Sequence, residues 1–143
     1  MRCEMVVDPA CEERVVIYTN KKTALAEEIR SLIERSGGVL FGYRHNEIVK
    51  LTPTDIHCIC VVGNKVYALC DNERYWLKER LYVLETTLPD GFVKINQSCL
   101  GNVAKMERFD TSLSGTLKIR FQNGHVDYVS RRQLKAVKER IGI

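Results

Sequence analysis

Short stretches in which hydrophobic and polar residues alternate occupy most of the chain after residue 38. In the clearest case, residues 117–121, Leu, Ile and Phe alternate strictly with Lys and Arg. A period of two is typical of a strand with one buried face. Turn-forming residues follow several stretches, as in Gly63-Asn64-Lys65 and Asn123-Gly124. The pattern predicts an antiparallel sandwich or barrel with strands at residues 39–43, 47–51, 56–62, 66–70, 73–76 and 117–121.

Three segments instead carry hydrophobic residues at helical spacing. The first, residues 22–35, is apolar at positions 25, 29, 32 and 33, and Gly37-Gly38 would end the helix. The second has leucine at positions 77, 81, 84 and 88, and the third begins after Ser130. We therefore expect a mainly β chain of the α+β class, with short helices.

The segment before the glycine pair differs from the rest. Alternation at residues 3–7 and 14–19 predicts two strands, which precede the helix at residues 22–35. We expect a small strand–strand–helix extension at residues 1–37 and a larger, mainly β domain at residues 38–143. The length of 143 residues fits one domain with a short appended element.

Composition is that of a globular protein, with 45% hydrophobic and 28% charged residues. The most apolar stretch, residues 56–62, is too short to cross a bilayer. The N-terminal residues lack the apolar region of a signal peptide. These observations predict a cytoplasmic protein that does not insert into a membrane.

Six cysteines are spread along the chain, and we expect them to be reduced. Disulfide scaffolds belong to oxidising compartments, which a cytoplasmic chain does not meet. Cys58 and Cys60 share one face of a predicted strand, but no second close pair of Cys or His follows, so the spacing is poor for zinc. The sequence predicts small, half-buried thiols with no metal and no cofactor. A redox switch is the alternative.

Basic residues are concentrated in the last third of the chain. The formal net charge is +4, but residues 91–143 hold ten Lys or Arg against four Asp or Glu, whereas residues 1–90 carry a net charge of −2. A basic region on a nearly neutral body is typical of a surface that binds a polyanion. An ordinary solvated basic surface has the same count.

Motifs for catalysis are missing from the sequence. It contains no Gly-x-Ser-x-Gly elbow, no phosphate-binding P-loop, no dinucleotide-binding glycine motif and no His-Glu-x-x-His zinc motif. His45, His57 and His125 have no nucleophile nearby in sequence, and we expect them to be structural. These observations favour a binding protein over an enzyme.

Residues 130–133, Ser-Arg-Arg-Gln, are the first candidate binding segment. Ser130 and Gln133 have the spacing of a capping box at the start of a helix. Such a cap would hold Arg131 and Arg132 beside the positive end of the helix, where phosphate binds favourably. An Arg guanidinium can also bind a guanine edge through two donors. Further along the same helix, we expect Leu134, Val137 and Ile141 to form the buried stripe. An ordinary basic terminal helix is the alternative interpretation.

Two further segments carry polar side chains suited to nucleic acid. Residues 94–102 include Lys94, Gln97, Ser98 and Asn102, and amide side chains match adenine in both donor and acceptor. The turn at residues 63–65 presents the amide of Asn64 and the ammonium of Lys65 together. Local hydrogen bonds within polar loops are the alternative use of such residues.

The order and setting of these three segments resemble the LytTR family of bacterial DNA-binding domains. That family's run of Phe, a basic β segment, Ser, aliphatic, Asn and aliphatic is similar to residues 92–103, Phe-Val-Lys-Ile-Asn-Gln-Ser-Cys-Leu-Gly-Asn-Val. The family's closing Val-Ser-Arg-Arg motif, which precedes a Leu- and Lys-rich helix, is similar to residues 128–135. Its early strand, which leads into a Gly-Asn turn, is similar to residues 55–66. The resemblance covers about residues 38–143. The part before it is similar to short LytTR regulators that lack a receiver domain.

The resemblance implies a mostly β transcription regulator whose loops enter successive major grooves of double-stranded DNA. By motif position it implies base contacts from Asn64 or Lys65, from Asn102 and from Arg131. Lys94 and Gln97 are further DNA-binding candidates in the same segments. The phosphate contacts that the resemblance implies are Ser98, Lys105, Arg132 and Lys135.

The chain departs from the family pattern at two places. Cys60-Val61 replaces an acidic-small pair that is common before the Gly-Asn turn, and Gln97 stands where a basic residue is common. Cys99 lies inside the candidate DNA-reading segment, and we expect it to be accessible to oxidation or alkylation.

We expect a homodimer, because a module of this size makes limited contact with DNA and a second copy doubles that contact. The N-terminal strands and helix are the candidates for the dimer contact. An RNA- or ribosome-associated β module is the main alternative. RNA readers stack bases on exposed aromatics, whereas Trp76, Phe92 and Phe121 fall at positions predicted to be buried. A redox-sensing interaction protein that uses its cysteines is the third hypothesis.

Overall fold

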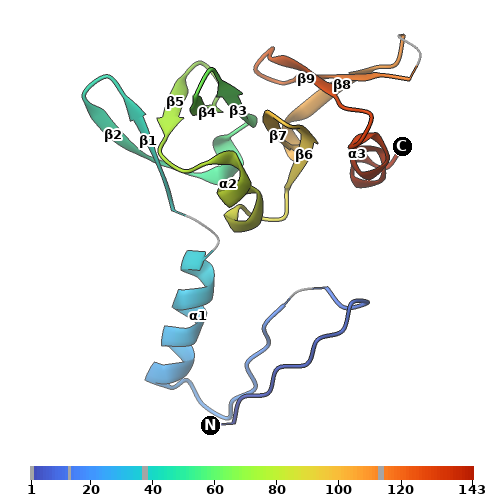
Figure 1. Cartoon of the computed structure of the whole chain (residues 1–143). Coiled ribbons are helices and arrows are strands. Elements are labelled where there is room, and N and C mark those ends of the chain that lie inside the picture. Colours follow the sequence, from blue (N-terminus) through green and yellow to red (C-terminus); the bar gives the residue numbers. More distant parts are fainter. Residues whose placement is uncertain (1, 13, 37–38, 113–114) are drawn as a thin grey trace. The chain divides into compact units, whose positions relative to one another are not determined.

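The computed structural model describes residues 2–12, 14–36, 39–112 and 115–143 and falls into two units, Met1–Ile33 and Glu34–Ile143 (Figure 1). The predicted glycine stop at residues 37–38 lies outside the described residues. Within the described ranges, no helix is long and apolar enough to cross a membrane.

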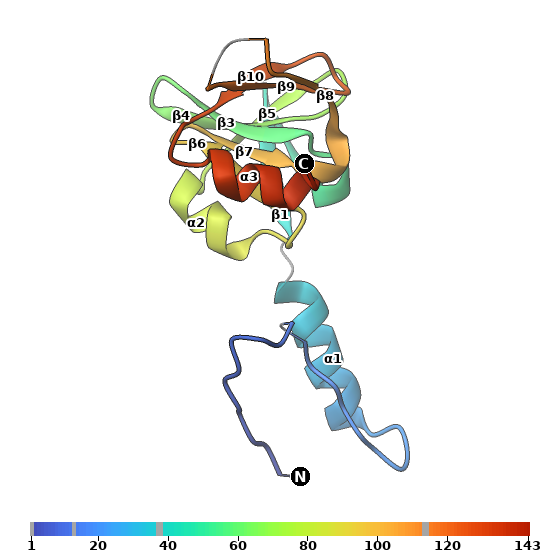
Figure 2. The same ribbon diagram turned by 90° about the vertical axis from the view of Figure 1, so that its right-hand side faces the viewer.

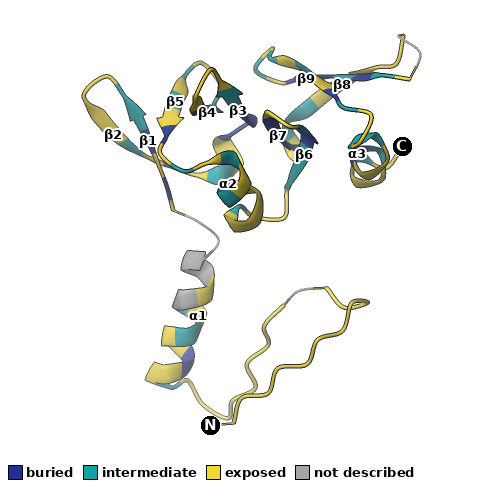
Figure 3. Cartoon of the chain, in the orientation of Figure 1, coloured by how far each residue is buried: buried dark blue, intermediate teal, exposed yellow. Residues whose placement is uncertain are grey.

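Helix α1 (Ala24–Ser36), most of which lies in the first unit, confirms the helix expected at residues 22–35. Thr23 begins it, since its hydroxyl oxygen accepts a hydrogen bond from the Ala26 amide at 3.1 Å. The two strands predicted at residues 3–7 and 14–19 are wrong, because the described residues before α1 form no strand. Apolar side chains in this segment, including Val7 and Tyr18, are exposed (Figure 3). In the described part of this segment, the alternating residues therefore neither pair with another strand nor bury an apolar face.

A seven-stranded antiparallel sheet forms the centre of the second unit, in the order β2-β1-β5-β4-β3-β7-β6. The turn between β3 and β4 depends on Gly63, whose φ of 64° is left-handed. The 3-10 turn η1 (Pro53–Asp55) leads into the third strand. The strands are β1 (Leu40–Arg44), β2 (Glu47–Leu51), β3 (Cys58–Val62), β4 (Lys65–Leu69), β5 (Arg74–Leu77), β6 (Phe92–Asn96) and β7 (Cys99–Asn102).

A second, three-stranded antiparallel sheet has the order β10-β9-β8, with β8 (Met106–Asp110), β9 (Leu117–Phe121) and β10 (Val126–Val129). The 3-10 turn η2 (Val103–Lys105) joins the two sheets along the chain. Two short helices complete the unit, α2 (Leu81–Thr87) and α3 (Leu134–Ile141). The predicted mainly β, antiparallel architecture is confirmed, although α2 is shorter than its leucine spacing suggested, since Leu77 belongs to β5.

The two faces of the large sheet bury different side chains. Ile59 and Leu100 belong to the first core, which α2 covers, whereas Cys58, Cys60 and Cys99 belong to the second. The smaller sheet and α3 cover that second core; Figure 2 shows β9 and β10 on one side of the large sheet and α2 on the other. All three apolar side chains of β9 are buried there, as the alternation at residues 117–121 predicts.

Gly101 lets the two sheets approach each other closely. A Cβ at this position would lie 2.8 Å from Cε of Met106 and 3.0 Å from Cζ of Phe121. Because protein interiors are close-packed, any larger side chain would force the ring of Phe121 to move. The glycine is therefore a packing requirement of the second core.

Asn102 and His57 are buried polar residues, and both are bonded inside the protein. The Nδ2 of Asn102 donates to the Ile56 carbonyl at 2.8 Å, and its Oδ1 accepts from the Ala104 amide at 3.1 Å. His57 accepts from the Asn123 amide at Nδ1 (3.3 Å), which leaves Nε2 as the donor to Asp71 at 2.6 Å. His57 is thus structural, as predicted. These bonds link the residues just before β3 to η2, to the connection after β4 and to the turn between β9 and β10.

Substitution of Asn102 is expected to weaken the fold. Asn102→Ala leaves the Ile56 carbonyl and the Ala104 amide without their partners, so the free energy of unfolding should fall by about 1–3 kcal/mol. The exposed Asn64 provides the matched control, and Asn64→Ala should change that free energy by less than about 0.5 kcal/mol. Urea denaturation followed by circular dichroism measures both. Equal stabilities for the two variants would contradict this role.

Candidate nucleic-acid interface

The three segments that the sequence singled out meet in the structure. The Val61 amide, at the end of β3, donates to the Ser98 carbonyl in the β6–β7 turn at 2.8 Å. The Ser130 amide, after β10, donates to the Ile95 carbonyl of β6 at 2.9 Å. The β3–β4 turn, the β6–β7 turn and the β10–α3 connection are therefore held side by side.

Asn96 joins two of these connections, the β6–β7 turn and the stretch that leads from β10 toward α3, a role that the sequence did not reveal. Its Nδ2 donates to the Tyr128 carbonyl at 2.7 Å and to Oδ1 of Asp127 at 2.9 Å, and its Oδ1 accepts from the Ser98 amide at 2.8 Å. Burial raises the pKa of Asp127, but hydrogen bonds from His125 and from the Tyr128 amide outweigh burial and hold that pKa below its usual value. The carboxylate therefore stays ionised as an acceptor for Asn96.

A basic hollow of about 740 Å³ lies beside the first two connections. Four of the predicted residues line it: Asn64, Lys65, Lys94 and Gln97. Lys78 and Arg80, from the connection between β5 and α2, line it too and were missed by the sequence analysis. Their only signal in the sequence is the basic and aromatic run at residues 74–82, whose pattern predicts a strand and a helix but no binding site.

The electrostatics of the hollow favour an anion. The described lining includes Lys65, Lys78, Arg80 and Lys94, against the carboxylates of Glu79 and Glu85. Glu85 is 3.9 Å from the Lys94 ammonium, so it offsets part of that charge. Positive groups beside exposed amides can bind phosphate oxygens and also base edges.

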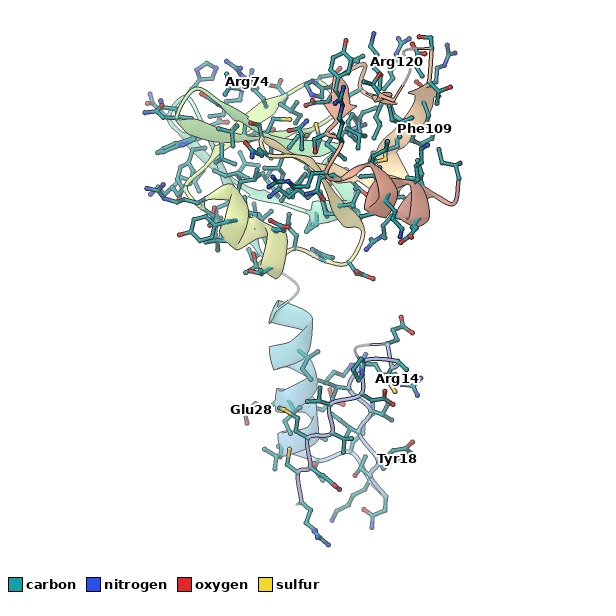
Figure 4. All side chains as sticks on the ribbon, turned by 45° about the vertical axis from the view of Figure 1, so that its right-hand side comes forward. Arg14, Tyr18, Glu28, Arg74, Phe109 and Arg120 are labelled. Carbon is teal, nitrogen blue, oxygen red and sulfur yellow. The ribbon has the colours of Figure 1, made fainter. Side chains whose placement is uncertain are left out.

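The aromatic side chains differ from the expectation. Trp76 is 37% exposed rather than buried, and the ammonium of Lys65 lies 5.6 Å from the centre of its ring. The guanidinium of Arg74 similarly stacks over Tyr67 at 4.7 Å, and Figure 4 shows Arg74 pointing outward. Phe121 is fully buried, as predicted, and Phe92 is partly buried. Trp76 is exposed because the smaller sheet covers the β3 and β7 part of the face, while β5 lies farther along the large sheet.

Arg131 and Arg132 are exposed, but a capping box does not hold them. Helix α3 begins only at Leu134, and Gln133 makes no capping side-chain bond. The Gln133 amide instead donates to the Ser130 carbonyl at 3.0 Å, which closes a turn over the two arginines. The predicted buried stripe of α3 is confirmed: Leu134, Val137 and Ile141 pack in the second core.

Three other predicted positions differ from their expected setting. Asn102 is only 5% exposed and both ends of its amide are bonded, so we now expect it to position the loops rather than to contact a base. Ser98 precedes β7, whereas Lys105 lies in η2, which follows the other end of that strand. Lys105 is therefore separated from the three connections by the length of β7. Cys99 is fully buried, which corrects the expectation that it is accessible to oxidation or alkylation. Ser98 and Lys135 are exposed, as DNA contacts require.

Comparisons with known proteins agree with this geometry. The family model described as LytTr DNA-binding domain matches residues 46–142. Uncharacterized HTH-type transcriptional regulators of Staphylococcus aureus, from strains NCTC 8325 and COL, are 35% identical over 104 residues, which cover 73% of this chain and 71% of each relative. A solved LytTr DNA-binding domain from Bacillus cereus has the same fold, with a TM-score of 0.69 and 18% identity over 73% of this chain and 97% of that domain. The chain belongs to the LytTR family of DNA-binding domains.

Proposed function

We propose that the chain is a transcription regulator that reads double-stranded DNA through the three joined connections. The observation that carries this proposal is the bonding among the three connections, which brings exposed amide and basic side chains from distant parts of the chain together. Asn96 links the β6–β7 turn to β10, and the Val61 amide links the end of β3 to the same turn. A regulator of this kind acts on the chromosome, so the expected cytoplasmic location follows from the proposed function.

Loops, rather than a recognition helix, would make the base contacts. A helix-turn-helix needs two consecutive helices joined by a short turn. In the described part of the second unit, five strands separate α2 from α3 along the chain, and α3 packs its apolar stripe into the second core. The exposed turn residues are thus the available readers of base edges.

Each exposed residue suits a distinct kind of contact. The planar guanidinium of Arg131 suits a guanine edge, and the amide of Gln97 suits adenine in place of the buried Asn102. Asn64 and Lys65 occupy the neighbouring turn. The remaining polar and basic side chains suit phosphate oxygens and would set the register on the duplex: Lys78, Arg80, Lys94, Ser98, Arg132 and Lys135.

RNA binding is the second candidate, and the exposure of Trp76 favours it. An exposed indole beside Lys65 is a surface on which an unpaired base can stack. Selection of bound genomic duplex fragments, with single-stranded RNA as competitor, separates the two functions. Enrichment of one duplex sequence in the presence of excess RNA supports the proposal. If the RNA displaces the duplex fragments from the protein, the alternative is supported.

Substitutions in the turns should separate sequence reading from general affinity. Arg131→Ala and Gln97→Ala are expected to reduce the preference for the selected duplex over a scrambled one by about 1–3 kcal/mol each, because each removes a two-bond base contact. Lys135→Ala should lower the affinity for both duplexes by about the same factor, since phosphate contacts are independent of sequence. Titrations by fluorescence anisotropy on both duplexes measure this.

Lys50→Ala is the matched control, because Lys50 is exposed on β2, at the opposite edge of the large sheet from β6. It should leave both affinities unchanged. Equal loss on the two duplexes for Arg131→Ala would refute a base-reading role for this residue.

We also propose that residues 1–37 support a homodimer that binds two half-sites. A single module buries only about 600–1,000 Å² on DNA, which limits its affinity. The N-terminal unit carries exposed Met5, Val6, Val7 and Tyr18, which a second copy could cover. Linking two modules in this way raises affinity without any new contact to a half-site.

Half-site spacing tests the dimer. Moving one half-site by about five base pairs turns it to the opposite face of the duplex, and the affinity is expected to fall on the order of a hundredfold as the second module is lost. A move of about ten base pairs restores the face and should restore most of the affinity. Affinity that is indifferent to both moves would show that the modules bind independently.

A further inference from the structure

Three thiols, an imidazole and a carboxylate from three different segments meet in the second core. Cys58 and Cys60 lie on β3, and Cys99 lies on β7 directly opposite Cys60 in the antiparallel register. His125, just before β10, and Asp127 within it face them from the smaller sheet. Two overlapping groups form, Cys58–Cys60–His125 and Cys60–Cys99–Asp127, in each of which the donor atoms all lie within 4.8 Å of one another.

The separations between donors are those of a compact cluster around Cys60. Its sulfur is 3.7 Å from the sulfur of Cys58 and 3.7 Å from Nε2 of His125. The sulfur of Cys99 is nearer, at 3.2 Å, and Oδ2 of Asp127 is 3.9 Å away.

These separations are close to those of a tetrahedral zinc site. Zinc binds sulfur at about 2.3 Å and imidazole nitrogen at about 2.0–2.1 Å, so neighbouring ligand atoms lie about 3.5–3.8 Å apart. The Cys58–Cys60 and Cys60–His125 separations meet this requirement. The sulfur of Cys99 lies within 4.8 Å of Cys60 but not of both Cys58 and His125. It must therefore move toward these two ligands, and its separation from the sulfur of Cys60 must widen by roughly half an ångström, to join the same coordination sphere.

We propose that Cys58, Cys60 and His125 bind a thiophilic divalent metal ion of the zinc class, and that Cys99 moves toward them to supply the fourth ligand. Sulfur and imidazole donors select such ions over magnesium or calcium, which prefer oxygen. Each thiol binds as a thiolate and releases its proton to solvent, and the positive ion offsets the buried negative charge. The coordinate bond at Nε2 of His125 replaces the contact of that nitrogen with Asp127, 3.4 Å away.

Sequence spacing did not predict this site, because its ligands come together only through strand pairing. Cys58 and Cys60 form one close pair, but Cys99 and His125 reach them through the β3–β7 register and the packing of the two sheets. The expectation of small core thiols without a metal does not account for an imidazole nitrogen placed within 4.8 Å of two of them. A bound ion would satisfy the imidazole and the three sulfurs at once.

The ion would also support the candidate nucleic-acid interface, a consequence that rests on the proposed function. Asp127 accepts from Nδ2 of Asn96, the residue that links the β6–β7 turn to β10. Metal bonds to β3, β7 and the start of β10 would fix these strands relative to one another. The ion is thus structural, and it stabilises the turns that lie beside it.

Cobalt(II) titration of the reduced full chain tests the site without DNA. The parent protein carries Cys3→Ser and Cys11→Ser, which remove the two exposed thiols. We expect one cobalt ion per chain, with sulfur-to-cobalt charge-transfer absorption and the strong visible bands of a tetrahedral site, displaced by zinc. Zinc should also raise the Tm of the parent protein.

Two variants and one control locate the ligands. Cys60→Ser should weaken binding on the order of a hundredfold or more, and His125→Gln, at a less buried position, should also weaken it strongly. Cys70→Ser is the matched control, since Cys70 packs against the first core, and it should bind as the parent does. Circular dichroism confirms that each variant is folded.

Absence of the charge-transfer band in the parent protein, or unchanged binding in both ligand variants, would overturn the proposal. Zinc-loaded and chelator-treated parent protein are then compared for DNA affinity, which we expect chelation to lower. A chain that binds cobalt as described but binds no duplex would refute the proposed function and leave the metal site standing.

Discussion

Burial of β3 on both of its faces is the constraint on which the rest of the second unit depends. Ile59 points into the core beneath α2, while Cys58 and Cys60 point into the core beneath the smaller sheet. A shift of one residue would exchange the two faces and place the larger side chain against the wrong layer. The register of β3 therefore determines where its neighbours β4 and β7 lie, and with them the turns that precede or follow these strands.

Local patterns predicted the elements whose burial follows from their own sequence. The alternation at residues 117–121 corresponds to β9, and the helical spacing at residues 22–35 corresponds to α1. The same alternation failed at residues 3–7 and 14–19, because a strand also needs a hydrogen-bonding partner, which a local pattern does not supply. At Ser130 and Gln133 the spacing of a cap was present, but the backbone formed a turn first.

The candidate site divides in a similar way. Asn64, Lys65 and Gln97 were identified because motif order marked the turns that carry them, and the structure brings these turns together. Lys78 and Arg80 enter from a connection with no motif of its own, so only the folded chain places them there. Asn102 fits the motif pattern, yet it is buried and both ends of its side-chain amide are hydrogen-bonded to the backbone. Strand register and sheet packing, which bring Cys99 and His125 to β3, are equally invisible to spacing along the chain.

The bonding of Asn96 has a consequence for how such a regulator diversifies. One side chain links the β6–β7 turn to the segment that leads into α3, so the distance between these reading positions is set by the scaffold and not by the residues that face the DNA. Duplicated genes could acquire new operators by exchanging exposed side chains at fixed positions, without altering the geometry between them. Paralogues would then differ in which bases they prefer while retaining the same spacing between recognised bases.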